Sequence, residues 1–81
     1  MRQIFSTQNE HAHELEVWVE PFCNSYRVPP GATLTLYADP ASELFGEPET
    51  EVSRERVILW LEETHAPDAE LNGKPLLPNQ Q

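Results

Sequence analysis

Alternation of apolar and polar residues between positions 15 and 38 is the clearest pattern in this chain. In residues 15–20 (LEVWVE) and 33–37 (TLTLY) every second residue is aliphatic, which is the period of a strand with one buried face. Between them, Pro29 and Pro30 remove two backbone donors and Gly31 accepts a positive φ, so this segment ends one strand and begins the next. We predict two strands of one core, with Trp18 on the outer face of the first.

Shorter runs predict further strands. Residues 3–7 form a candidate edge strand, and residues 22–28 form a second apolar cluster with a turn at Asn24-Ser25. Asn72-Gly73 suits the two positive φ values of a type I′ hairpin. Pro75 confines the return arm of that hairpin to a sheet edge. The tail 77–81 has little to bury, and we expect it to be frayed.

The strongest apolar run, residues 57–61 (VILWL), allows two interpretations. Ser53 could cap a helix that continues to Thr64, but five consecutive apolar positions give no stripe of period 3.6, and two of the five are β-branched. We favour a central strand over 56–62 that is buried on both faces. The segment 39–50 is rich in Pro, Gly and acids and is read as a loop, which the pair Leu44-Phe45 would pin to the core.

These elements predict one domain over residues 1–81. About six short runs separated by turns, with one arguable helix, are typical of an all-β fold, a small antiparallel β-sandwich or a partly open barrel. At 81 residues and 9.3 kDa, such a domain buries roughly 60% of the surface that its unfolded chain exposes.

Charge then narrows the classes of partner. Fourteen acidic and five basic residues give a net charge of −9, which repels phosphate backbones and anionic lipids. We therefore expect no nucleic-acid partner and no membrane partner, and no apolar run approaches the roughly 18 residues of a membrane span. One cysteine and an N-terminus without an apolar signal region lead us to expect a cytoplasmic protein.

The outer face of the strand 15–20 supplies the candidate binding residues, Glu16, Trp18 and Glu20. Tryptophan is enriched where protein partners bind, and the acids, with the acidic segment 39–51, would favour a partner with a basic or mixed surface. The alternative is that Trp18 is covered by a second sheet or by the acidic segment, in which case it is a packing residue.

Metal binding is the second possibility. His11 and His13 would share a face on a strand and could bind a divalent metal together with Cys23 or Glu20. The pair is similar to the histidines of cupins, but the glutamate expected four or five residues later is replaced by Val17 and Trp18. Cys23 could also serve as a nucleophile, although a lone cysteine more often packs as a small apolar residue. We expect no catalytic residue and no required cofactor.

The segments VWVEP (17–21) and VPPG (28–31) resemble a group of short, uncharacterised bacterial proteins. The resemblance implies a bacterial protein and no particular activity. From the residues we expect a small, non-enzymatic binding or accessory module that contacts a protein partner. The alternatives are a metal-binding domain that uses His11 and His13, and a small enzyme. The pattern leaves the oligomeric state open.

Overall fold

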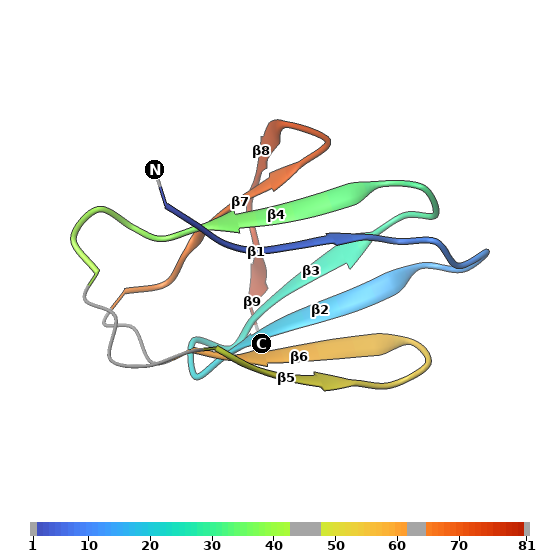
Figure 1. Cartoon of the computed structure of the whole chain (residues 1–81), viewed down its shortest axis with the longest axis horizontal. Coiled ribbons are helices and arrows are strands. Elements are labelled where there is room, and N and C mark those ends of the chain that lie inside the picture. Colours follow the sequence, from blue (N-terminus) through green and yellow to red (C-terminus); the bar gives the residue numbers. More distant parts are fainter. Residues whose placement is uncertain (1, 43–47, 62–64, 81) are drawn as a thin grey trace.

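The computed structural model describes residues 2–42, 48–61 and 65–80, and every regular element in these ranges is a β-strand (Figure 1). The strands are β1 (Gln3–Gln8), β2 (Leu15–Glu20), β3 (Asn24–Val28), β4 (Thr33–Tyr37), β5 (Glu49–Val52), β6 (Arg56–Trp60), β7 (Asp68–Leu71), β8 (Lys74–Leu76) and β9 (Asn79–Gln80). Two sheets share one apolar core, so the expected all-β sandwich is confirmed. No described residue belongs to a helix long and apolar enough to cross a membrane.

The strands form a four-stranded sheet in the order β1-β4-β7-β8 and a five-stranded sheet in the order β5-β6-β2-β3-β9. In Figure 1 the four-stranded sheet lies above the five-stranded one. Adjacent strands are antiparallel except for β2 and β6, which are parallel. The described residues form nine strands, more than the approximately six that were expected, and one of the pairs is parallel. Parallel pairing requires a long connection, and here β3, β4 and β5 lie between the two partners in the sequence.

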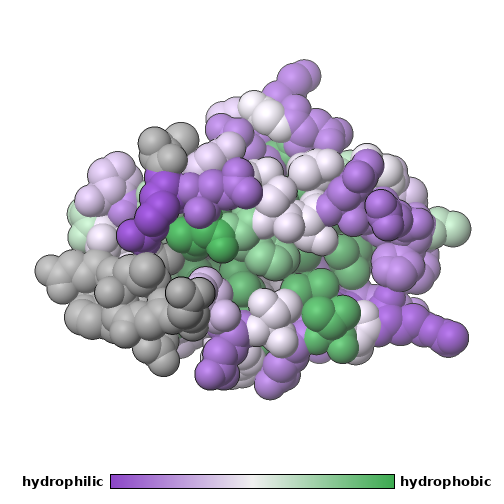
Figure 2. Space-filling view, in the orientation of Figure 1, coloured by the Kyte–Doolittle hydropathy of each residue, from purple (hydrophilic) through white to green (hydrophobic). Residues whose placement is uncertain are grey.

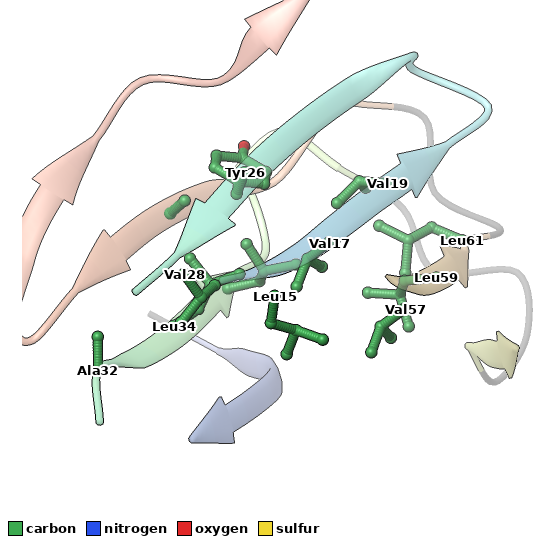
Figure 3. Close-up of a cluster of buried hydrophobic side chains, with 12 residues drawn as sticks. Leu15, Val17, Val19, Tyr26, Val28, Ala32, Leu34, Val57, Leu59 and Leu61 are labelled. Carbon is green, nitrogen blue, oxygen red and sulfur yellow. The ribbon is translucent and has the colours of Figure 1, made fainter. Parts of the chain in front are cut away.

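Alternation along the strands builds the core. The inward-facing residues that are completely buried come from both sheets: Val17, Val19, Val28, Leu34, Leu36 and Leu59. Figure 3 shows side chains of β2, β3 and β6 gathered together, with Leu34 of β4 among them. Burying one Val or Leu side chain stabilises the fold by about 1.5–3 kcal/mol. The strands 15–20, 33–37 and 56–60 thus contribute to one core, as predicted.

One side of the sandwich is incompletely covered. Figure 2 shows hydrophobic residues across the middle of this view, between the polar residues of the upper and lower strands. Val52 at the edge strand β5 is 75% exposed, although its cross-strand partner Val57 is buried. The five-stranded sheet therefore extends beyond the cover that the four-stranded sheet gives it, and the two sheets do not close into a barrel.

The prediction that the strand at 57–61 is buried on both faces is wrong. Val57, Leu59 and Leu61 are buried, whereas Ile58 is half-buried and Trp60 is 43% exposed. The strand itself is confirmed over Arg56–Trp60, in place of the helix alternative, and lies between β5 and β2. Its outward positions carry apolar side chains that the described residues do not cover completely.

The hairpin at Asn72-Gly73 is confirmed. These residues connect β7 to β8 with φ values of 51° and 82°, and Pro75 lies in β8 at the edge of its sheet. Asn72 also anchors the turn to β4, because its Oδ1 accepts a hydrogen bond from the Thr33 backbone N–H at 2.9 Å, and its own N–H donates to the Thr33 carbonyl at 2.9 Å.

The predicted turn at Asn24-Ser25 is wrong. Both residues are buried and open strand β3, and the connection from β2 is instead residues 21–23. Cys23 ends this connection with φ of 57°, a left-handed conformation that non-glycine residues adopt uncommonly. The residue types Asn and Ser are typical of turns, but here Ser25 Oγ donates to the Asn79 carbonyl at 3.2 Å and so holds the C-terminal strand.

The tail and the acidic segment also differ from expectation. The tail 77–81 is not simply frayed, because Asn79–Gln80 forms β9 and pairs with β3. Leu77, which precedes it, is 88% exposed. Within the segment 39–50 that was predicted to be a loop, Glu49 and Thr50 belong to strand β5, and the pair Leu44-Phe45 lies outside the described residues.

A buried asparagine joins two connections at one end of the sandwich. Asn9 is fully buried, and its Nδ2 donates to the carbonyls of His13 and Val28 at 2.8 Å each. Its Oδ1 accepts a hydrogen bond from the His11 N–H at 2.9 Å. Its backbone bonds Gly31 and Ala32, with its carbonyl accepting at 2.8 Å and its N–H donating at 2.9 Å. The connection after β1 is thereby fixed to the Pro29–Ala32 turn.

Candidate protein-interaction surface

The outer face of the five-stranded sheet carries both tryptophans of the chain. Because inward residues of β2 and β6 alternate with outward ones, the outward side chains form three cross-strand pairs: Glu16 with Arg56, Trp18 with Ile58, and Glu20 with Trp60. We call these six residues the tryptophan face. No other strand of the described chain brings a tryptophan to a surface.

Three of these side chains hold one another in place. Glu16 Oε1 lies 3.0 Å from Arg56 Nε and also accepts a hydrogen bond from the Trp18 indole Nε1–H. The guanidinium carbon of Arg56 lies 5.7 Å from the centroid of the Trp18 ring, within the range of a cation–π interaction. Trp18 is accordingly half-buried, with its N–H satisfied and its ring next to a cation.

A groove of about 260 Å³ opens beside this triad. It is lined by Trp18, Glu20, Arg56, Ile58 and Trp60. Trp60 is the more exposed of the two tryptophans, at 43%. The groove therefore combines aromatic walls with one carboxylate and one guanidinium, on side chains that project from hydrogen-bonded strands.

The three residues predicted from β2, namely Glu16, Trp18 and Glu20, all lie on this face. The contribution of β6 was missed, because the run VILWL was read as buried on both sides. Burial alternates along β6, but the outward residues Ile58 and Trp60 are apolar like the buried residues between them. Only Arg56 marks an outward position by its polarity, so the sequence alone does not show the alternation.

A larger cavity, of about 340 Å³, lies near the N-terminal end of β1. It is lined by Arg2, Ala38, Asp39, Pro40 and Ser42, and none of these residues is aromatic. We place the candidate site at the tryptophan face because Glu16, Trp18 and Arg56 contact one another there, beside a groove with aromatic walls.

The histidines and the cysteine lie at opposite ends of β2. His11 and His13 precede the strand and stack with ring centroids 5.1 Å apart, and His13 Nε2 lies 3.1 Å from the Arg54 carbonyl. Glu20 and Cys23 lie at its far end, where Cys23 Sγ is 3.8 Å from Glu20 Oε2. Six residues of strand span about 20 Å, so His11 and His13 are not brought to Cys23 or Glu20. Among the described residues, no three His, Cys, Asp or Glu side chains gather in a way that could hold a metal ion.

Comparison with known proteins identifies no relative from which a function could be inferred. No family model matches the chain, and no curated protein or solved structure is significantly similar to it.

Proposed function

We propose that this protein is a small binding module that contacts a protein partner with a basic or mixed surface through the tryptophan face. The observation that supports the proposal is the groove between Trp18 and Trp60, on the outer face of a sheet whose other face forms the core. Tryptophan and arginine, together with tyrosine, are the residue types that are enriched among binding hot spots.

Preorganisation adds to this argument. Side chains that become ordered only on binding reduce affinity by about 0.5–1.5 kcal/mol each. Trp18 and Arg56 are already held by Glu16, so a partner would meet side chains that are largely ordered. Trp18 and Arg56 also project from paired strands, and the pairing limits the movement of their backbone before a partner binds.

The charge of the chain indicates the kind of partner. A net charge of −9 favours encounter with positively charged or mixed surfaces.

The exposed free thiol of Cys23 supports a reducing, cytoplasmic location, where exposed cysteines stay unpaired.

The test compares matched aromatic variants in a quantitative affinity measurement. A partner is first captured from lysate of the source organism, and its affinity is then measured for the wild type, for Trp18→Ala and for Tyr37→Ala. Tyr37 is a half-buried aromatic on the outer face of the other sheet, so it controls for the loss of an aromatic side chain. We expect Trp18→Ala to weaken binding about thirtyfold, corresponding to roughly 2 kcal/mol, and Tyr37→Ala to leave binding unchanged.

Thermal midpoints separate binding from folding. A folded Trp18→Ala variant with unchanged affinity, or a Tyr37→Ala variant that loses affinity to the same extent, would remove the tryptophan face as the binding site. If Trp18→Ala proves unfolded, Trp60→Ala provides the same test at a more exposed position.

A further inference from the structure

The tryptophan face already contains one complete arginine-binding arrangement. Arg56 lies 3.0 Å from the Glu16 carboxylate through its Nε and 5.7 Å from the centroid of the Trp18 ring through its guanidinium carbon. A carboxylate beside an aromatic ring suits a guanidinium, because the planar group can hydrogen-bond at its edge and stack with its face.

The same combination recurs around the second tryptophan. Trp60 is paired across the sheet with Glu20 of β2 on one side and with Glu49 of β5 on the other. Directly paired residues project from the same face of a sheet, and adjacent strands lie about 4.8 Å apart. Glu20 and Glu49 therefore project from the same face as Trp60 on the two neighbouring strands, and Glu20 also lines the groove. Glu51 of β5 stands opposite Ile58 in the next row.

No cation of the chain occupies this second arrangement in the described residues. Neither Glu20 nor Glu49 forms an ion pair there, and the arginine that stacks on a tryptophan does so on Trp18. Trp60 is 43% exposed and borders the groove together with Glu20. Over β2, β5 and β6 the outer face holds four glutamates, at positions 16, 20, 49 and 51, and one arginine, which is already paired.

We propose that Trp60, Glu20 and Glu49 bind an arginine side chain of the partner. The inference rests on the proposed function and names the chemistry that this face recognises. An arginine is favoured over a lysine because a guanidinium can stack on the indole and bond a carboxylate at the same time, whereas an ammonium acts as a compact, strongly hydrated point charge. Arg56 does not oppose the second arginine strongly, since its charge is offset by Glu16.

A peptide titration tests this chemistry without the physiological partner. The probe is acetyl-Gly-Arg-Gly-amide, and the matched control is the same peptide with neutral citrulline in place of arginine. Binding at low salt is followed by the indole N–H signals of the ¹⁵N-labelled protein. The chain has two tryptophans, and the spectrum of a Trp60→Phe variant assigns each signal.

We expect the Trp60 signal to shift saturably with the arginine peptide and far less with the citrulline peptide. Glu20→Gln and Glu49→Gln should each weaken binding by about two- to fivefold, as exposed charge pairs do. Glu70→Gln, on the outer face of the other sheet, should leave it unchanged. Equal shifts with both peptides, or Glu20→Gln and Glu49→Gln variants that bind like the wild type, would overturn the proposal.

The affinities of the variants for the physiological partner distinguish a failure of this inference from a failure of the proposed function. If Trp18→Ala weakens partner binding but Glu20→Gln and Glu49→Gln do not, the face binds the partner without an arginine at Trp60, and only the inference fails. If none of the three variants changes partner affinity, the proposed function itself fails.

Discussion

At the scale of single residues, the side chain of Asn9 supplies hydrogen bonds that irregular backbone cannot obtain from strand pairing. Two carbonyls, at His13 and Val28, and one N–H, at His11, depend on it. The sequence shows only a polar residue in the run Gln8-Asn9-Glu10, which reads as a solvated turn. Its burial could not be predicted, because the second connection that it bonds lies about twenty residues away in the chain.

We expect Asn9→Ala to lower the free energy of unfolding by about 1–3 kcal/mol, because it leaves buried polar groups without partners. Asn9→Asp should be worse, since a carboxylate would replace the donating amide next to two carbonyl oxygens. Urea unfolding at pH 7 measures both variants, with Gln8→Ala as the exposed neighbouring control. An Asn9→Asp variant as stable as the wild type would contradict the hydrogen-bond assignment.

Tyr26 is the residue whose ionisation is most clearly tied to folding. Burial, with a smaller contribution from the charge of Asp68, raises the pKa of its phenol from 10.0 to about 12. The folded state therefore holds the proton to a higher pH than the unfolded state does. The contribution of the protonated Tyr26 phenol to the free energy of unfolding is fully present below pH 10. It is lost as the pH rises from about 10 through about 12, and the loss is about 2–3 kcal/mol in all.

The variant Tyr26→Phe tests this, because it removes the ionising group and keeps the ring. We expect its stability to fall less steeply than that of the wild type between pH 9 and pH 12 in denaturant titrations. Tyr37→Phe removes the other tyrosine and should retain the steep fall. Parallel curves for the wild type and Tyr26→Phe would show that the Tyr26 phenol is not protected in the folded state.

At the scale of elements, β6 links the core to the tryptophan face. Its inward residues Val57 and Leu59 are buried, and its outward residue Trp60 is exposed. The strand is paired on both sides, with β5 and β2. Changes on one side of this strand should thus affect stability, and changes on the other should affect binding.

We expect Leu59→Ala to destabilise the protein by about 2–5 kcal/mol, as truncations of buried leucines do. Leu59 is completely buried, so the lost contacts leave a cavity. Trp60→Ala, at the next position on the opposite face, should cost far less in stability. Chemical denaturation of the two variants measures the difference, and a loss well under 1 kcal/mol for Leu59→Ala would mean that β6 does not contribute to the core as described.

The strands that could be predicted from the sequence are those whose two faces differ in polarity. In β2 and β4 aliphatic residues alternate with acids, threonines or aromatics, and both were predicted with the bounds that the structure has. In β6 both faces carry apolar residues, so the alternation is hidden. In β3 the buried Asn24 and Ser25 have the composition of a turn, and only the pairing with β2 and β9 shows that they are strand residues.

The residues of the candidate site also fall into those that the sequence could predict and those that it could not. Glu16, Trp18 and Glu20 follow from the alternation within one strand, which is local information. Their neighbours Arg56, Ile58 and Trp60 depend on the parallel pairing of β2 with β6, and this pairing joins segments about forty residues apart. No local pattern specifies which of the strands become neighbours.

At the scale of the whole molecule, the excess of acidic residues acts on association rather than on the fold. The charge on the outer face of β2, β5 and β6 is part of a net charge of −9. A field of this kind extends about 30 Å at 0.01 M salt and about 8 Å at 0.15 M. The encounter with a basic partner should therefore be faster at low salt, while the packed contacts of the groove change little.

We expect the association rate constant with the partner to fall about tenfold or more between 0.01 M and 0.15 M salt, with a much smaller change in the dissociation rate.

Two double variants with the same change in net charge separate local from global charge. Glu49→Gln/Glu51→Gln, on the strand beside Trp60, should slow association more than Glu10→Gln/Glu70→Gln, which lie away from the tryptophan face. Surface-immobilised kinetics at several salt concentrations measure both constants. Equal effects of the two double variants would mean that the net charge alone steers the encounter, and a salt dependence confined to dissociation would mean that the partner is not guided by charge.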